Sequence, residues 1–235
     1  RADPGTLSAV GAGVLRNGAR GGSLGREKAG RVVSSGMADA NRPRVRIGLG
    51  WDLHRLEDAA PGTPGSGGPP GNPWESSGGA RRGAPLRPLL IGGVELEFAK
   101  GRERGVVAHS DGDVLLHALT DAILGALGEP DIGQLFPDND PANAGRTSAD
   151  FVREAAARMA RAGYAIGNVD ATVILQEPRI GARKDEIRAR VAGLLGVEPW
   201  RVNVKGKSHE RVDAVGEGRA VEAHVVVVLE EGTGA

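Results

Sequence analysis

The sequence predicts an α+β fold in which a mixed sheet of the four-stranded type is covered on one side by helices. Strand-like and helix-like segments alternate along the chain, which favours a layered sheet-and-helix architecture. The run Val225–Val228 is apolar at every position, so we expect a strand that is buried on both faces. With 235 residues, the chain is long enough for one large domain or for a smaller domain with extensions.

Each element is predicted from a local pattern. Ser110 has the position of a helix N-cap, with Asp113 three residues later as in a capping box, and this helix is expected to run to about Leu127. Apolar spacing and adjacent glycines predict the other elements. These are strands at Val45–Gly48, Leu89–Ile91, Val169–Leu175, Val202–Val204 and Ala220–Leu229, and helices at Asp150–Ala162 and Asp185–Leu195.

Two glycine-rich stretches define the expected domain organisation. The second of them contains too little apolar surface to offset the entropy lost on ordering, so it is interpreted as a flexible surface loop. We therefore expect a leader at 1–43, a folded domain at 44–230 with a flexible Gly/Pro-rich insertion at about 57–88, and a tail at 231–235.

The leader is basic although the whole chain has no net charge. Through Arg44 there are eight basic residues against Asp3, Glu27 and Asp39. A basic, acid-poor segment of this kind is typical of an organelle transit peptide. The alternatives are a disordered tail, or upstream sequence ahead of a true start at Met37.

Composition excludes several classes of protein. The chain has no cysteine and therefore no disulfide framework. It has no apolar run near the roughly 20 residues that span a bilayer, so no membrane partner is expected. The basic residues of the leader are dispersed and not interleaved with aromatic residues, so no nucleic-acid partner is expected either.

The segment Gly50-Trp51-Asp52-Leu53-His54 carries the strongest chemical signal. In a strand, Asp52 and His54 lie on one face, because side chains alternate with a period of two. His117 lies on a helix between Asp113 and Asp121, at positions that form one stripe. Three ligands with a fourth position open are typical of catalytic zinc. The alternative is a solvated helix face with a hydrogen-bonded core histidine.

Two further positions leave alternatives open. Asp121 either orients His117 from outside the metal's first ligand shell or is an exposed helix carboxylate. His109 precedes the helix, where a phosphate is favoured by free backbone N–H groups, but a plain loop histidine is equally compatible.

Taken in order, the motifs resemble the 2-C-methyl-D-erythritol 2,4-cyclodiphosphate synthase family. The likeness covers Val45 to Leu229 apart from the insertion. The segment Ser208–Glu217 is similar to the plant and algal branch, which agrees with a plastid leader and a stromal location. The alternative is a bacterial-type cytoplasmic protein starting at Met37. The motifs include RIGLGWDLHR at 46–55, LIGGV at 90–94, AHSDGDVLLHALTDAILG at 108–125, DIGQLFPDND at 131–140 and KGKSHE at 205–210.

The resemblance implies a homotrimer with its sheets facing the three-fold axis and with active sites between subunits. The substrate would be the 2-phosphate of 4-diphosphocytidyl-2-C-methyl-D-erythritol, whose 2-phosphate attacks the β-phosphorus and expels CMP. One Zn²⁺ per subunit would be held by Asp52, His54 and His117, and a second divalent cation, Mg²⁺ or Mn²⁺, by Glu210. His109 and Ser208 would stabilise the transition state.

The resemblance also implies which residues contact the substrate. The methylerythritol part would meet Asp131, Ile132, Gly133, Phe136, Pro137, Asp138, Asn139 and Asp140. The cytidine loop would be Leu175, Gln176, Glu177, Pro178, Arg179, Ile180 and Gly181. The phosphates would meet Asp52, His54, His109, Ser110, Lys207, Ser208, His209 and Glu210. Two other functions stay open: a zinc hydrolase that activates water, and a non-catalytic metal-stabilised trimer.

Overall fold

The computed structural model describes residues 43–58, 86–99, 104–137, 140 and 146–232. Most of the predicted leader, the central part of the predicted insertion and the end of the tail lie outside the described residues, as do the predicted site residues Asp138 and Asn139.

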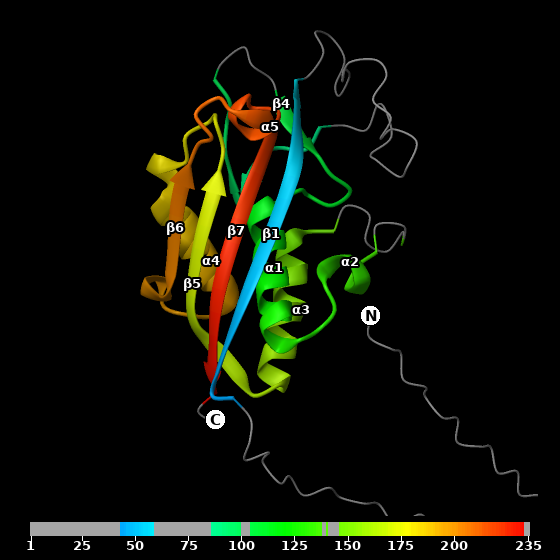
Figure 1. Ribbon diagram of the computed structural model, residues 1–235, viewed down its shortest axis with the longest axis vertical. Coiled ribbons are helices and arrows are strands. Elements are labelled where there is room, and N and C mark those ends of the chain that lie inside the picture. Colours follow the sequence, from blue (N-terminus) through cyan, green and yellow to red (C-terminus); the bar gives the residue numbers. More distant parts are fainter. Residues whose placement is uncertain (1–42, 59–85, 100–103, 138–139, 141–145, 233–235) are drawn as a thin grey trace, which may run out of the picture. The chain divides into compact units, whose positions relative to one another are not determined.

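One mixed sheet forms the first layer of the fold, and helices cover one of its faces (Figure 1). The strand order is β4-β1-β7-β5-β6, with β5 and β6 parallel and the other neighbours antiparallel. The mixed sheet under helices is confirmed, but the sheet has five strands and not four, because β4 pairs with the end of β1. The bounds are β1 Val45–Asp58, β4 Arg104–Val107, β5 Tyr164–Ile174, β6 Val202–Lys207 and β7 Ala220–Glu231.

The strands are longer than the sequence patterns indicated. β1 continues through Gly48 and Gly50 to Asp58, so the first two residues of the predicted insertion, 57 and 58, belong to this strand. At its other end, Arg87 already pairs with Val106. β5 starts at Tyr164, because a bulge between Ile166 and Asn168 lets the ladder continue past Gly167. A separate hairpin consists of β2 Leu90–Ile91 and β3 Val94–Glu95.

Helix α1 is the centre of the helical layer. Ten of its 14 residues are buried, because the sheet covers one side of it and α3 another. The predicted N-cap Ser110 is wrong: Asp113 is the cap, and its carboxylate accepts hydrogen bonds from the backbone N–H groups of Leu115 and Leu116. The helices are α1 Val114–Leu127, α2 Ile132–Leu135, α3 Ser148–Arg161, α4 Lys184–Leu195 and α5 Asp213–Gly216, with single 3₁₀ turns at Gly181–Arg183 and Pro199–Arg201.

The same Asp113 carboxylate ties α1 to the β2–β3 hairpin. It accepts hydrogen bonds from Gly92 N at 2.9 Å and Gly93 N at 2.6 Å. Both glycines have positive φ, of 62° and 77°, as a two-residue hairpin turn with the twist of its strands requires. A long-range contact therefore selects the helix start, which a local capping pattern cannot reveal.

Strand β1 lies directly on α1 because its inward residues there are glycines. A Cβ atom at Gly48 or Gly50 would lie 1.8 Å from the carbonyl oxygen of Ala122 or Ala118, respectively. Ala118 and Ala122 are small and stand one turn apart on the helix face. The next inward residues of β1 are Asp52 and His54, so this close packing carries them to the N-terminal half of α1.

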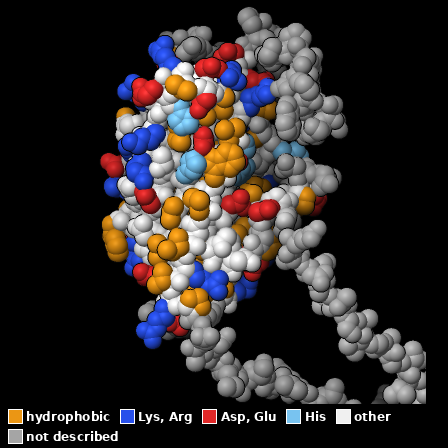
Figure 2. Space-filling view, in the orientation of Figure 1, with side chains coloured by type: hydrophobic (Ala, Val, Ile, Leu, Met, Phe, Trp, Pro, Cys, Tyr) orange, Lys and Arg blue, Asp and Glu red, His pale blue; other side chains and the backbone are white. Residues whose placement is uncertain are grey.

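The other face of the sheet exposes apolar side chains. Ile47, Leu49 and Trp51 of β1 are 68%, 66% and 53% exposed, and Val226 of β7 is 38% exposed. Figure 2 shows hydrophobic side chains gathered over these strands. The expectation that β7 is buried on both faces is therefore wrong for the single chain. Among the described residues, no helix has the length and apolarity needed to cross a membrane.

Candidate functional site

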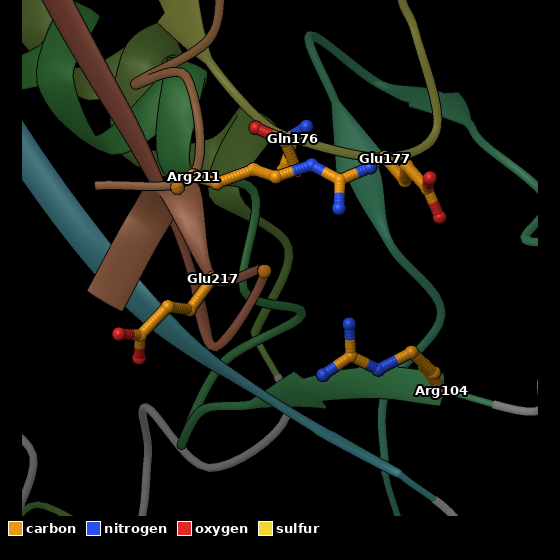
Figure 3. A pocket seen from close by; sticks show the side chains of 7 residues that line it. Arg104, Gln176, Glu177, Arg211 and Glu217 are labelled. Carbon is orange, nitrogen blue, oxygen red and sulfur yellow. The ribbon is translucent and has the colours of Figure 1, made fainter. Parts of the chain in front are cut away.

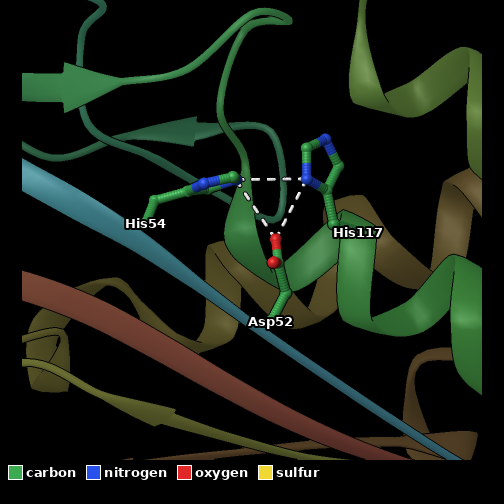
Figure 4. Close-up of side chains that lie close together, drawn as sticks. All are labelled: Asp52, His54 and His117. Atoms are coloured by element: carbon green, nitrogen blue, oxygen red, sulfur yellow. Dashed lines mark hydrogen bonds and ion pairs between the residues drawn. The ribbon is translucent and has the colours of Figure 1, made fainter. Parts of the chain in front are cut away.

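Strand β1 and helix α1 bring three potential metal ligands together. Asp52 Oδ2 lies 3.1 Å from His54 Nε2 and 3.0 Å from His117 Nδ1, and the two imidazole nitrogens are 3.1 Å apart. The three side chains converge on one another from β1 and α1 (Figure 4). The sequence expectation that these residues meet is confirmed.

The donor set fits a metal ion. Two imidazole nitrogens and one carboxylate oxygen face a common point, and the three groups are only partly buried, so one side stays accessible. In a tetrahedral zinc site with bonds of about 2.0–2.1 Å, neighbouring ligand atoms are roughly 3.3 Å apart, which is close to the separations seen here. Among the described residues, this is the one cluster of at least three such groups.

The carboxylate and the imidazoles perturb one another electrostatically. Burial alone would raise the pKa of Asp52, but the hydrogen bonds and positive charge of His117 and His54 outweigh it and hold that pKa well below its usual range. Burial opposes charge on His117, yet the hydrogen bond to Asp52 raises its pKa. The cluster thus favours a positive charge beside Asp52, as a site for a cation should.

The second ring nitrogen of His117 contacts serine hydroxyls. Its Nε2 is 2.8 Å from Ser148 Oγ and 3.2 Å from Ser110 Oγ, so predicted site residue Ser110 does lie at the cluster. Asp121 does not orient His117 by a hydrogen bond. Its carboxylate accepts one from Ile132 N at 2.8 Å, and burial raises its pKa.

His109 is exposed and lies five residues before α1 begins. The interpretation that an anion binds His109 at the start of this helix is wrong in its geometry, because the carboxylate of Asp113 already occupies that helix end. Burial raises the pKa of Asp113. Any contact of His109 with a substrate must therefore come from the loop and not from the helix terminus.

The predicted methylerythritol segment lies beside α1. Asp131 is the N-cap of α2 and accepts a hydrogen bond from Gln134 N at 2.8 Å. Phe136 packs on Phe151 of α3 with ring centroids 4.6 Å apart, and the Arg146 guanidinium lies 4.9 Å from the Phe136 ring. Because the Phe151 ring is 5.8 Å from His117, this aromatic pair lies near the potential metal ligands.

A cavity of about 340 Å³ lies at the ends of β5 and β6. It joins much of the predicted cytidine loop to the predicted phosphate residues, although these segments are about 30 positions apart in the sequence. A cis peptide bond precedes Pro178 in that loop. From the predicted set, the cavity is lined by Leu175, Gln176, Arg179, Ile180, Gly181, Lys207, Ser208 and Glu210.

Three predicted residues, Glu177, Pro178 and His209, do not line this cavity. Glu177 lines a neighbouring cavity of similar volume, into which Arg104 and Arg211 project from different sides (Figure 3). His209 Nδ1 pairs with Asp213 at 2.8 Å, and Glu210 accepts a hydrogen bond from Ser208 Oγ at 2.7 Å. Glu210, Arg211 and Asp213 all have positive φ, of 51°, 67° and 64°, so this loop is held in a conformation that L-residues rarely adopt.

The sequence interpretation missed several residues of the site. Ser148 contacts both Asp111 and His117, and Lys184 lines the cavity at β5 and β6. One usable signal was present. Thr147 and Ser148 precede an apolar helix pattern and are typical of a helix start, so they indicate that α3 begins earlier than Asp150. Nothing local indicated that Ser148 would meet His117, because 31 positions separate them.

Comparisons with known proteins agree with this geometry. Residues 45–230 match the YgbB family. The chain is 48% identical over 184 residues to a chloroplastic 2-C-methyl-D-erythritol 2,4-cyclodiphosphate synthase of Arabidopsis thaliana, covering 78% of this chain and 66% of the relative. This share is slightly under two thirds of the plant protein's length. The chain is also 49% identical to the synthase of Aromatoleum aromaticum, and this match covers 78% of this chain and 93% of the relative.

Solved structures show the same fold. The chain is similar to the IspF protein of Plasmodium falciparum in its CDP complex, with a TM-score of 0.60 and 32% identity over 80% of this chain and 97% of the other.

Proposed function

We propose, because the chain belongs to the YgbB family, that it cyclises 4-diphosphocytidyl-2-C-methyl-D-erythritol 2-phosphate in the non-mevalonate route of isoprene biosynthesis. An oxygen of the 2-phosphate attacks the β-phosphorus, and the bond from that phosphorus to the α-phosphate oxygen breaks. The products are 2-C-methyl-D-erythritol 2,4-cyclodiphosphate and CMP, so the enzyme is a phosphorus–oxygen lyase. The convergence of Asp52, His54 and His117 carries the proposal.

Asp52, His54 and His117 would hold one Zn²⁺ per subunit. A zinc ion there supplies a Lewis acid for the β-phosphate. The attacking group is already a phosphate anion, so the protein needs no general base of the Ser-His-Asp kind. Its residues act by positioning and by neutralising charge, which is what phosphoryl transfer chiefly requires.

The cavity at β5 and β6 would bind the cytidyl end of the substrate. Gln176 and Arg179 line it on the loop side, and Lys207 and Glu210 line it on the phosphate side. Glu210 would hold the second divalent cation, Mg²⁺ or Mn²⁺, since carboxylate oxygen is the ligand such ions prefer. Ser208 donates a hydrogen bond to Glu210, which supports a role for both residues beside the leaving phosphate.

The remaining assignments follow the same division. Lys207, Ser208, His209 and Glu210 would contact phosphates, with Ser208 and His109 stabilising the transition state. Asp131 to Gly133 and Phe136 to Asp140 would contact the methylerythritol part. The aromatic pair of Phe136 and Phe151 next to His117 supports that placement.

The exposed apolar face of the sheet supports a homotrimer whose sheets face a common axis and whose active sites lie between subunits. Burying such a stripe of β1 side chains against other copies removes apolar surface from water. An Ile47→Asp variant is expected to sediment as a monomer, whereas Trp200→Asp, a change at an equally exposed residue away from the sheet face, should keep the wild-type mass. A wild-type monomer would contradict this proposal.

The named chloroplastic relatives support a plastid stromal location, with 1–43 as a transit peptide. A fluorescent protein carrying residues 1–43 should enter plastids. Cytoplasmic fluorescence would favour a start at Met37.

The proposed reaction is tested with the purified full chain and the cytidyl substrate. The wild-type protein should release CMP and cyclic diphosphate in equal amounts, and Asp52→Ala should lose bound zinc and both products. Asp185→Ala, which removes a highly exposed helix carboxylate, is the matched control and should retain both. Release of inorganic phosphate by the wild type would favour a zinc hydrolase, and a folded, zinc-loaded trimer without turnover would favour a binding protein.

A further inference from the structure

We propose that Ser148 and Asp111 are positioning residues that fix the tautomer and ring orientation of His117. They would do so from the side of the ring opposite Asp52 and His54. This inference rests on the proposed metal site, and it assigns a role to two buried or half-buried groups that the site itself does not use.

The hydrogen-bond directions determine the tautomer. Ser148 Oγ donates its one proton to Asp111 Oδ1 in a short contact, because an ionised carboxylate has no proton to give. The same hydroxyl lies 2.8 Å from His117 Nε2 and can only accept there. Without a metal ion, Nδ1 donates to Asp52 Oδ2 at 3.0 Å. With a metal ion in the site, the lone pair of Nδ1 is needed there and the single ring proton lies on Nε2, where Ser148 Oγ can accept it.

The Asp111–Ser148 pair is fixed to two helices. Asp111 Oδ2 accepts from the backbone N of Ser148, the first residue of α3, at 2.9 Å. Its Oδ1 lies within reach of Asp113 N at the cap of α1, at 3.3 Å. Ser148 is fully buried, so water cannot replace its hydroxyl without rearrangement. The contact thus holds the N-terminal ends of α1 and α3 in the relation that aims His117.

A purely structural role is the competing explanation, because Asp111 also caps α3. The two roles separate cleanly in this chain. Ser148→Ala keeps the backbone N–H that Asp111 caps and removes only the hydroxyl that faces His117. Thr147→Ala removes a neighbouring hydroxyl, whose partner is Asp150 and not His117, and so serves as the matched control. Ser148→Thr restores a hydroxyl at the same position.

Zinc affinity of the full chain is measured by competition with a chromophoric chelator. Loss of a group that orients a metal-bound histidine typically weakens binding about ten- to a hundred-fold, so Ser148→Ala and Asp111→Asn should bind zinc that much less tightly. Ser148→Thr should recover most of the affinity, and Thr147→Ala should match the wild type. Equal zinc affinity in Ser148→Ala and the wild type, with both folded by circular dichroism, would overturn the proposal.

The hydrogen bond of the Nε2 proton gives a second readout that a structural role would not move. In ¹⁵N-histidine-labelled, zinc-loaded protein, His117 should carry its proton on Nε2, and its signal is identified by its loss in His117→Gln. In zinc-loaded Ser148→Ala the proton stays on Nε2 but loses its acceptor, so the Nε2 signal should shift, whereas Thr147→Ala should leave it in place. A wild-type His117 with its proton on Nδ1 would refute the inference. If the wild-type chain binds no zinc, the proposed metal site fails, and the Nε2 signal of His117 in the apo wild type, compared with that in apo Ser148→Ala, then tests the Ser148 contact separately.

Discussion

Replacing Asp113 with alanine is expected to destabilise the fold by roughly 3 kcal/mol without touching a proposed ligand. Its carboxylate accepts four backbone hydrogen bonds, at 2.6–3.2 Å, from Gly92, Gly93, Leu115 and Leu116. Loss of an N-cap costs about 1 kcal/mol. The N–H of Gly92 is then left buried without a partner, which costs about 1–3 kcal/mol. Gly93 is exposed and can turn to water, so it adds little.

An Asp113→Asn variant separates these contributions. Three of the four hydrogen bonds end on Oδ1 and survive in an asparagine, whereas the one from Gly93 to Oδ2 is lost. We expect a cost of about 1 kcal/mol, since an exposed donor is easily rehydrated. The cost for alanine should therefore be about three times that for asparagine.

The assay is urea unfolding followed by far-ultraviolet circular dichroism at a fixed protein concentration, repeated at a second concentration because assembly adds to apparent stability. With a slope of about 2 kcal/mol per molar urea, the midpoint should fall by about 1.5 M for alanine and about 0.5 M for asparagine. Asp150→Ala, at a more exposed carboxylate in the first turn of α3, should shift it by no more than about 0.5 M. Alanine and asparagine variants with the same midpoint would refute the reasoning.

Two further predictions concern the sheet. Gly50→Ala should destabilise the fold by about 3 kcal/mol or more and weaken zinc binding, because the new Cβ would lie 1.8 Å from Ala118 O. Gly193→Ala, with no atom within 4 Å, should be neutral or stabilising in the same urea and zinc assays, and equal effects would contradict the packing argument. The second prediction concerns Asp170 of β5. Burial raises the pKa of its carboxyl group, but the hydrogen bond from Lys205 outweighs burial and holds that pKa below its ordinary 3.8. The stability advantage of wild type over Asp170→Asn, under about 1 kcal/mol, should therefore be constant at neutral pH and vanish as pH falls below 3.8, and a constant difference in acid would refute it.

The three candidate metal ligands were accessible to sequence reasoning because the geometry within each element is local. Asp52 and His54 share a strand face by the period of two, and His117 belongs to a helix whose apolar positions are plain. The resemblance to the family supplied the pairing of strand and helix. The order of the mixed sheet, the edge strand β4 and the full length of β1 were not predicted. In β1, the glycines suggest the end of a strand unless their close packing on α1 is known.

The sequence alone therefore determined the fold class, the family, the three converging ligands and most residues of the cavity at β5 and β6. Only the tertiary structure decided where α1 begins, what Asp121 binds and which group faces the far nitrogen of His117. Those outcomes depend on hydrogen bonds between segments 11 to 37 positions apart. Each of these polar groups takes the partners that satisfy the buried donors around it, and those donors come together only when the chain folds.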